Sequence, residues 1–293
     1  MGVRGIFFCP SECRAGKHPQ GGEAQAHPAE LNMKIIVCLK QVPESQDVRL
    51  DPETHNLQRE GVKSIINPFD LYALEEGLRV RQQQGGEVIV LSMGPPQAEA
   101  ALREALTYGA DQAVLLSDRA FAGADTWATA YTLAAGVRRL GGADLIFCGK
   151  QAIDGDTAQV GPELAAFLDI PHVAWARKLT FSSSNLLQVE RLLDHGYDQV
   201  EVQLPALITV VKEINEPRLP SFKAKLRAKS ATIPVVNLAD LGLKESQVGF
   251  KGSYTRVVKV FPPPARGQRE ILQGTSEEMA VSLWSRLQQL QGR

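Results

Sequence analysis

The sequence has few aromatic residues, few cysteines and almost no net charge. Of its 293 residues, 6% are aromatic and four are cysteine, and 32 basic residues balance 33 acidic ones to leave a formal charge of −1. This balance gives no sequence-wide attraction to nucleic acid or to a membrane surface. No run of about 18 apolar residues occurs, which argues against a spanning helix. We therefore expect a cytoplasmic protein with no nucleic-acid partner and no membrane span.

The four cysteines stand in two different settings. Cys38 and Cys148 lie in apolar strand sequence, where a cysteine in a reducing compartment is usually a small buried hydrophobic residue. Near the start of the chain, Cys9 and Cys13 could be imagined as metal ligands with two histidines, His18 and His27. The spacing is not that of a zinc knuckle, so we predict no metal site.

Residues 1–32 differ from the rest of the chain, because glycine, proline, histidine and glutamate are scattered through them without apolar periodicity. We expect this segment to be disordered or to result from an early start codon. Its apolar run at Ile6–Phe8 is too short for the hydrophobic region of a secretory signal. The overall content of 44% apolar residues is ordinary for a globular protein with one substantial core.

Residues 33–214 begin with an alternation of apolar strand sequences and amphipathic helical sequences. The expected strands are 34–39, 87–92, 112–116 and 144–148, and the expected helices are 68–83, 97–108, 125–140 and one that starts at Ala158. This alternation predicts a doubly wound, mostly parallel α/β sheet with helices on both faces. Ligands of such sheets bind at the carboxyl ends of the strands, where this chain has glycine-rich turns.

After Pro171 the pattern changes to strands, at 172–181, 186–192, 199–202 and 206–212. We expect these to add antiparallel strands to the edge of the sheet. The basic segment 217–230 has little periodicity and predicts a surface loop. Further on, 256–261 is a candidate exposed strand and 275–290 has the spacing of an amphipathic helix. Residues 215–293 are therefore expected to form a loop and a C-terminal arm.

The turn at 149–159 joins a buried strand to a helix and is polar. Gly149 and Gly155 allow the backbone to bend and to approach a ligand closely. Asp156 and Thr157 can cap the following helix, whose free N–H groups and dipole favour an anion. An ordinary capped turn would look the same, so this motif alone leaves both interpretations open.

A second polar turn, SDRAFAGADTWAT at 117–129, also follows a strand and opens a helix. Asp125 is placed as the N-cap of that helix and Thr126 as its first residue. A polar loop without a ligand is the alternative interpretation here.

Together these turns resemble the nucleotide-binding segments of the electron transfer flavoprotein β subunit. The similar segments are MKIIVCLKQVPE at 33–44, INPFD at 66–70, SMGPPQAEAALREALTYGAD at 92–111, GKQAIDGD at 149–156 and INEPRLPSF at 214–222. The resemblance covers about residues 33–290, and GKQAIDGD and NEPR are specific to that family. It implies an adenine nucleotide α-hydrolase-like fold, a partner-docking loop, and an arm that wraps an α subunit.

The resemblance also implies which residues contact the cofactor. The AMP part of the site would be built from Cys38, Lys40, Asn67, Asp70, Met93, Gly149, Gln151, Asp154, Gly155, Asp156, Thr157, Ala158, Gln159, Val160 and Gly161. A loop for the diphosphate and flavin end of FAD would add Asp118, Arg119, Gly123, Asp125, Thr126 and Thr129, with Arg119 able to contact the flavin or NADH. For Cys38 and Met93, core packing is the alternative role. No catalytic base or nucleophile is predicted, because the flavin carries the redox chemistry.

The segment at 117–129 and VVKEINEPRLPS are closely similar to the electron-bifurcating branch, whose β subunit binds FAD in place of structural AMP. This similarity implies that NADH reduces the flavin here. One electron would pass to ferredoxin or flavodoxin, and the other through the α-subunit FAD to a dehydrogenase of the acyl-CoA, enoyl-CoA, hydroxy acid or quinone type. The alternative is a conventional carrier whose β subunit binds AMP and docks acyl-CoA-type dehydrogenases. An unrelated nucleotide-binding α/β protein would leave NEPRLPS unexplained.

Two features depart from the family pattern. Arg218 and Leu219 are the expected docking residues, but Leu219 follows Arg218 directly, whereas conventional β subunits have a few residues between them. Trp127 stands where the bifurcating branch commonly has a smaller aliphatic residue. Asp194 and His195 are expected in a solvated turn between strands rather than in a proton relay.

We predict that residues 1–32 are dispensable, because Met33 opens the first core strand. A protein that begins at Met33 should pair with its α subunit and retain nucleotide, as measured by co-purification and by nucleotide content after denaturation. Loss of folding on this truncation would show that the segment packs against the core.

Overall fold

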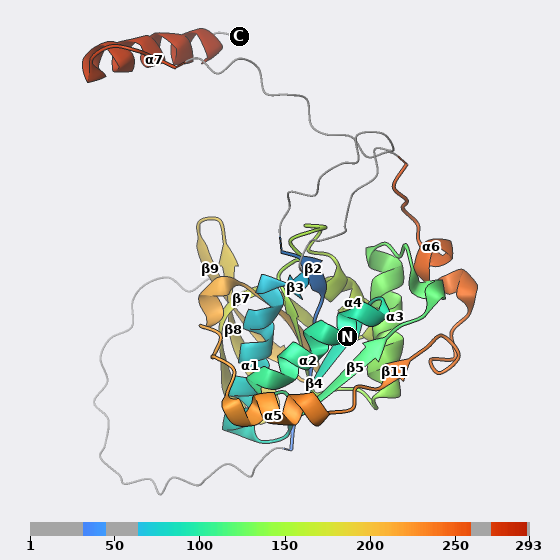
Figure 1. Cartoon of the computed structure of the whole chain (residues 1–293). Helices are drawn as coiled ribbons and strands as arrows, with labels where there is room; N and C mark the ends of the chain where they lie inside the picture. Colours follow the sequence, from blue (N-terminus) through green and yellow to red (C-terminus); the bar gives the residue numbers. More distant parts are fainter. Residues whose placement is uncertain (1–31, 45–63, 259–270, 292–293) are drawn as a thin grey trace, which may run out of the picture. The chain divides into compact units, whose positions relative to one another are not determined.

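Short apolar runs form a nine-stranded sheet in the order β11-β5-β4-β1-β6-β10-β7-β8-β9. Figure 1 shows β4, β5 and β11 on the right of the sheet and β7, β8 and β9 on the left. All neighbours from β11 to β7 are parallel, and β8 and β9 continue the sheet in antiparallel fashion. The strands are β1 (Lys34–Cys38), β4 (Glu87–Met93), β5 (Gln112–Leu116), β6 (Leu145–Gly149), β7 (His172–Ser183), β8 (Leu186–Leu193), β9 (Gly196–Gln203), β10 (Ala206–Val210) and β11 (Val235–Val236). A separate pair is formed by β2 (Gln41–Pro43) and β3 (Ser64–Ile66).

The computed structural model describes residues 32–44, 64–258 and 271–291. The described residues up to Tyr254 belong to one compact unit, and those from Thr255 belong to a second. The second unit contains α7 (Ser276–Gln291), which confirms the helix expected at 275–290. Residues 256–258 form no strand, and the rest of the strand expected at 256–261 lies outside the described residues, as do 1–31.

Helices cover both faces of the sheet. On one face lie α1 (Pro68–Gln84), α2 (Glu99–Tyr108) and α5 (Phe222–Ser230), and on the other lie α3 (Thr126–Arg139) and α4 (Val160–Leu168). Alternate residues of β1 serve the two faces, because Ile35 and Val37 pack with the first group and Ile36 with the second. The predicted doubly wound fold is therefore confirmed. Among the described residues, no helix is long and apolar enough to cross a membrane.

The order of the strands creates a switch point between β1 and β6. From β1 the chain adds β4 and β5 on one side, and it then returns to add β6 and β10 on the other. The loops that follow β1 and β6 therefore leave the sheet in opposite directions at its carboxyl edge. Such a point is where open parallel sheets bind ligands.

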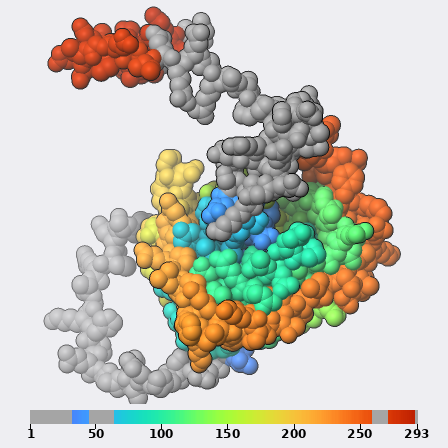
Figure 2. Space-filling model, in the orientation of Figure 1, coloured from blue at the N-terminus to red at the C-terminus, as the bar shows by residue number. Residues whose placement is uncertain are grey.

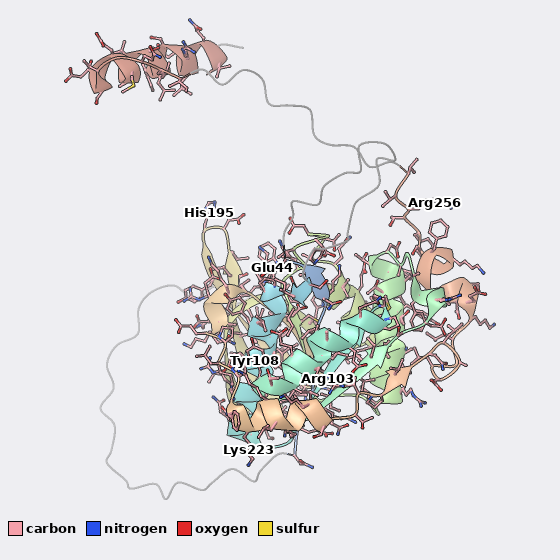
Figure 3. The ribbon with its side chains drawn as sticks, in the orientation of Figure 1. Glu44, Arg103, Tyr108, His195, Lys223 and Arg256 are labelled. Atoms are coloured by element: carbon pink, nitrogen blue, oxygen red, sulfur yellow. The ribbon has the colours of Figure 1, made fainter. Side chains whose placement is uncertain are left out.

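One expectation about the last strands was wrong. The strand expected at 206–212 is not an antiparallel edge strand, because β10 lies inside the sheet, parallel to both β6 and β7. All five residues of β10 are buried, as a strand covered on both faces requires. Only β8 and β9 form the antiparallel edge. Figure 3 shows His195 at the tip of the hairpin between them, in agreement with the expected exposed turn.

The loop expected at 217–230 contains a helix, so that expectation was also wrong in part. Ser221 caps α5 by accepting a hydrogen bond from the Ala224 amide at 3.1 Å, and α5 lies across α2 (Figures 2 and 3). Arg103 of α2 donates to the Ala228 carbonyl at 2.6 Å and to the Ala231 carbonyl at 3.1 Å. Ala228 is the buried residue of α5, so hydrogen bonds rather than an apolar stripe hold it.

Candidate nucleotide site

The buried carboxylate of Asp70 joins the ends of β1 and β6 to the start of α1. It accepts from the Lys40 amide at 2.7 Å, from the Asn67 side-chain amide at 2.9 Å, and from the Gly149 amide. Burial raises the pKa of Asp70 to about 7, while these N–H donors and Lys40 act in the opposite direction. A β-carbon at position 149 would lie 2.4 Å from the Asp70 carboxylate, so only glycine fits beside it.

Asn67 holds the turn that follows β6. Its side-chain N–H groups donate to Asp70 and, at 2.9 Å, to the Gln151 carbonyl, and its side-chain oxygen accepts from the Ile153 amide at 3.2 Å. These bonds use both the nitrogen and the oxygen of the side-chain amide, and only 1% of the Asn67 surface is exposed. Asn67, which the resemblance placed among the AMP contacts, therefore positions the loop in this structure.

The loop itself has an unusual backbone. Asp156 and Ala158 both have a φ of 55°, a left-handed conformation that is costly for residues other than glycine. The Lys40 ammonium forms an ion pair with the Asp154 carboxylate at 2.7 Å, and Gln151 donates to Asp156. The ion pair holds the loop next to the end of β1, and the residues from Asp154 to Thr157 stay exposed.

The amino terminus of α4 faces this loop and fits an anion. The helix begins at Val160, and its N-cap residue, Gln159, makes no side-chain cap hydrogen bond. The predicted caps Asp156 and Thr157 are wrong, because they precede the helix by more than one residue. Pro162 has no N–H group and the Glu163 amide donates to the Gln159 carbonyl at 3.0 Å, so the amides of Val160 and Gly161 are the first-turn donors that suit a phosphate. Gly161 lets α4 approach β10, since a β-carbon there would lie 2.6 Å from the Thr209 methyl.

Cys38 and Cys148 end β1 and β6 beneath the loops, and both are buried with free thiols. The hydrogen bond to Cys38, together with burial, raises the pKa of the Cys148 thiol well above its usual range. Burial therefore keeps the Cys148 thiol protonated, so it behaves as a small apolar group. Met93 ends β4 beside them and is partly exposed.

The second turn, at 117–126, is held chiefly by its own acidic side chains. Asp118 accepts from the Ala120 amide at 2.9 Å and from the Leu238 amide at 3.1 Å, and these backbone bonds lower its pKa. Asp125 accepts from the Ala128 amide at 3.0 Å, which confirms it as the N-cap of α3. Arg119 is exposed, and Gly123 takes a φ of 71°. Thr129 lies one turn into α3 and is partly buried.

A hydrogen bond joins the two helices that follow these turns. The hydroxyl of Thr126, the first residue of α3, donates at 3.1 Å to the carboxylate of Glu163 in the first turn of α4. The two helix amino termini therefore lie side by side at the carboxyl edge of the sheet. Burial and Asp125 raise the pKa of Glu163, and its second carboxylate oxygen has no hydrogen-bond partner among the described residues. Sequence reasoning missed Glu163, although its place in a helix first turn was a signal.

The segment before the second unit covers the outer side of the 117–126 turn. The Phe250 amide, in α6 (Gly249–Gly252), donates to the Ala122 carbonyl at 2.8 Å. Asp125 donates its amide to Ser253 at 2.8 Å and accepts from the Tyr254 amide at 2.9 Å. The ring of Trp127 contacts that of Phe167 at 4.6 Å and that of Tyr254 at 5.5 Å between centroids.

The predicted docking residues have separate roles in the structure. Arg218 forms a forked ion pair with Glu75 of α1, at 2.7 Å from Nε and 3.0 Å from one terminal nitrogen. Leu219 is 90% exposed. Only the leucine is therefore presented as an apolar surface.

Comparison with known proteins decides the family. The family described as "Electron transfer flavoprotein domain" matches residues 54–241. An electron transfer flavoprotein subunit beta of Thermoanaerobacterium thermosaccharolyticum is 50% identical over 256 residues, covering 87% of this chain and 98% of that protein. The chain belongs to the electron transfer flavoprotein family. It is a β subunit, and its role is in electron transfer.

Two further relatives of this β subunit have more specific names. The "Caffeyl-CoA reductase-Etf complex subunit CarD" of Acetobacterium woodii is 48% identical over 259 residues, covering 88% of this chain and 98% of that protein. "Protein FixA" of Bradyrhizobium diazoefficiens is 46% identical over 258 residues, covering 86% of this chain and 90% of that protein. The β subunit therefore resembles each of these three proteins over at least 90% of that protein's length.

We predict that Asp70 makes the stability of this β subunit fall as the pH rises. The ordinary pKa of an aspartate side chain is 3.8, and the pKa of Asp70 in the folded protein is about 7. Its stabilisation is therefore full below about pH 4 and is lost as the pH rises through about 7, by no more than about 4 kcal/mol. Urea unfolding should show that wild type loses stability relative to Asp70→Asn between pH 5 and pH 8. A difference between the two proteins that does not change with pH would contradict this assignment.

Proposed function

We propose that this β subunit binds FAD across both turns and takes part in electron bifurcation from NADH. The observation that carries the proposal is the Thr126–Glu163 hydrogen bond of 3.1 Å, which brings the amino termini of α3 and α4 together. AMP would use one helix terminus, whereas a dinucleotide has a second phosphate and a flavin to place. Adjacent termini with exposed loops before them suit the longer ligand.

The donors at the two turns fit the two ends of such a nucleotide. The start of α4, which has no side-chain cap from Gln159, suits the AMP part, and Cys38 and Met93 would supply apolar contacts to it. Thr126 and exposed Arg119 supply a hydroxyl and a fixed positive charge for the diphosphate or flavin. Glu163 would oppose an anion when ionised, and burial raises the pKa of this carboxyl group.

The bound FAD would supply the redox chemistry, with NADH as electron donor. The chain itself contributes positioning: Asn67 and Asp70 hold the AMP loop, and Asp125 orders the first turn of α3. We further propose that an α subunit carries the second flavin, and that ferredoxin or flavodoxin and a dehydrogenase accept the electrons. A cytoplasmic location accords with these partners.

The arm is proposed to bind the α subunit. Within the second unit, the apolar residues Val281, Leu283, Trp284, Leu287 and Leu290 of α7 are all at least 45% exposed. An amphipathic helix with an exposed apolar face needs a surface to cover it. The proposed division of labour thus places the cofactor in residues 33–214 and partner contacts in 215–293.

The alternative is a conventional carrier in which this chain binds AMP alone. The internal hydrogen bonds of Asp118 and Asp125 favour it, because they would order the second turn without a ligand. The flavin content of the purified αβ pair separates the two functions: two FAD per pair supports bifurcation, and one FAD with one AMP supports the conventional carrier.

We predict that Thr126→Val and Asp125→Ala lower the FAD content of this chain. The first removes a hydroxyl at nearly constant shape, and the second loosens the cap of α3 at a cost of about 1 kcal/mol. Both proteins should retain the AMP-binding loop, contain one flavin fewer per αβ pair, and fail to couple NADH oxidation to ferredoxin reduction. Thr126→Ser, which keeps the hydroxyl, is the matched control. Full flavin content and NADH oxidation in both variants would favour the conventional carrier.

We also predict that Leu219→Ala weakens electron delivery to the partner dehydrogenase. An exposed leucine that becomes buried in a complex contributes about 1–3 kcal/mol to binding. The KM for the dehydrogenase should rise while nucleotide content and thermal stability stay at wild-type values. An unchanged partner reaction would exclude this side chain from the docking surface.

A further inference from the structure

We propose that Glu75 and Glu76 of α1 are positioning residues that hold the Leu219 loop at a fixed place relative to the nucleotide site. Both are charged side chains in a buried setting, with 7% and 6% of their surface exposed. Buried carboxylates are rare unless they are paired. Their partners Asn215 and Arg218 lie in the segment that leads to Leu219, and a third partner, Arg79, contacts that segment at the Ile214 carbonyl. This inference rests on the proposed docking role of Leu219.

Glu75 binds the residue next to Leu219 at three points. Its carboxylate accepts from Nε of Arg218 at 2.7 Å, from a terminal guanidinium nitrogen at 3.0 Å, and from the Arg218 amide at 3.2 Å. The guanidinium fork fixes the orientation of Arg218, and the amide bond fixes its backbone. Leu219, 90% exposed, follows directly on this fixed backbone.

Glu76 holds the start of the same segment. It accepts from the side-chain amide of Asn215 at 2.9 Å, and that amide also donates to the Tyr72 carbonyl at 3.0 Å. Arg79, one turn further along α1, lies 3.4 Å from both Glu76 and the Ile214 carbonyl. Glu75 and Glu76 of α1 thus hold the two ends of the segment from Asn215 to Arg218 by hydrogen bonds and an ion pair.

The same helix is tied to the nucleotide loop at its amino terminus. Asn67 and Asp70 bind the turn after β6, and Glu75 follows Asp70 by five residues, about 7.5 Å along a helix axis. The single rigid element α1 therefore sets the distance between the nucleotide loop and Leu219. A partner docked at Leu219 would then lie at a constant separation from the nucleotide loop.

The test is Glu75→Gln in the full chain purified with its α subunit. Glutamine keeps the size of the side chain but cannot form the forked ion pair. Hydrogen exchange measured by mass spectrometry should become about tenfold faster in residues 214–222 and stay unchanged in 149–160. Arg218→Lys keeps the charge without the fork and should lie between wild type and Glu75→Gln. The matched control is Glu190→Gln, because Glu190 of β8 is also a carboxylate in an ion pair, with Lys178 of β7. This change should alter exchange in neither segment.

Unchanged exchange in 214–222 would overturn the proposal, as would an equal increase in both segments, which would indicate general destabilisation. A kinetic cycle with an acyl-CoA dehydrogenase as the probe partner gives the functional result. If Glu75 acts through Leu219, Glu75→Gln should raise the KM for the dehydrogenase without lowering kcat, and should add nothing to Leu219→Ala. Additive effects would overturn the positioning role. A Leu219→Ala protein with wild-type kinetics would instead refute the docking function, while the exchange result would still decide the tie between Glu75 and Arg218.

Discussion

The candidate nucleotide site at the carboxyl edge of the sheet depends on one buried carboxylate. Asp70 gathers N–H groups from the end of β1, from Asn67 before α1 and from Gly149 at the end of β6. These three elements meet where the sheet reverses its strand order, the place at which a parallel sheet offers its loops to a ligand. A buried carboxylate needs hydrogen-bond donors. Supplying them to Asp70 accounts for the close fit at Gly149, for the position of the 149–159 turn and for the direction of α1.

The parts of the fold that sequence analysis predicted are those with a strong apolar pattern. The alternating strands and helices up to β6 agree with the structure within about two residues, because each buries a continuous face. β10 was assigned to the wrong place even though ALITV is apolar at almost every position, which is typical of an interior parallel strand. Because antiparallel strands precede it in the sequence, β10 was expected to continue the antiparallel edge rather than to return to the interior of the parallel sheet.

Elements held by hydrogen bonds were harder to predict. α5 buries mainly Ala228 and depends on arginines from α2 and from its own sequence, so no periodic signal marks it. The residues of the candidate site were found through short motifs, yet their roles differ: Asn67, Asp118 and Arg218 bind other parts of the chain. A motif gives the residues that a loop needs, but only the fold shows whether each one faces the ligand or holds the loop.

The hairpin of β8 and β9 has a consequence for how this family can change. The chain leaves the sheet at β7, forms the hairpin, and re-enters at β10, directly beside the strand it left. Its two ends are therefore fixed next to each other whatever lies between them, and its tip at His195 is exposed. Additional residues there would not shift β6 or β10. The hairpin tip is thus a place where lineage-specific insertions, or a fused reporter domain, would leave the loops after β1 and β6 intact.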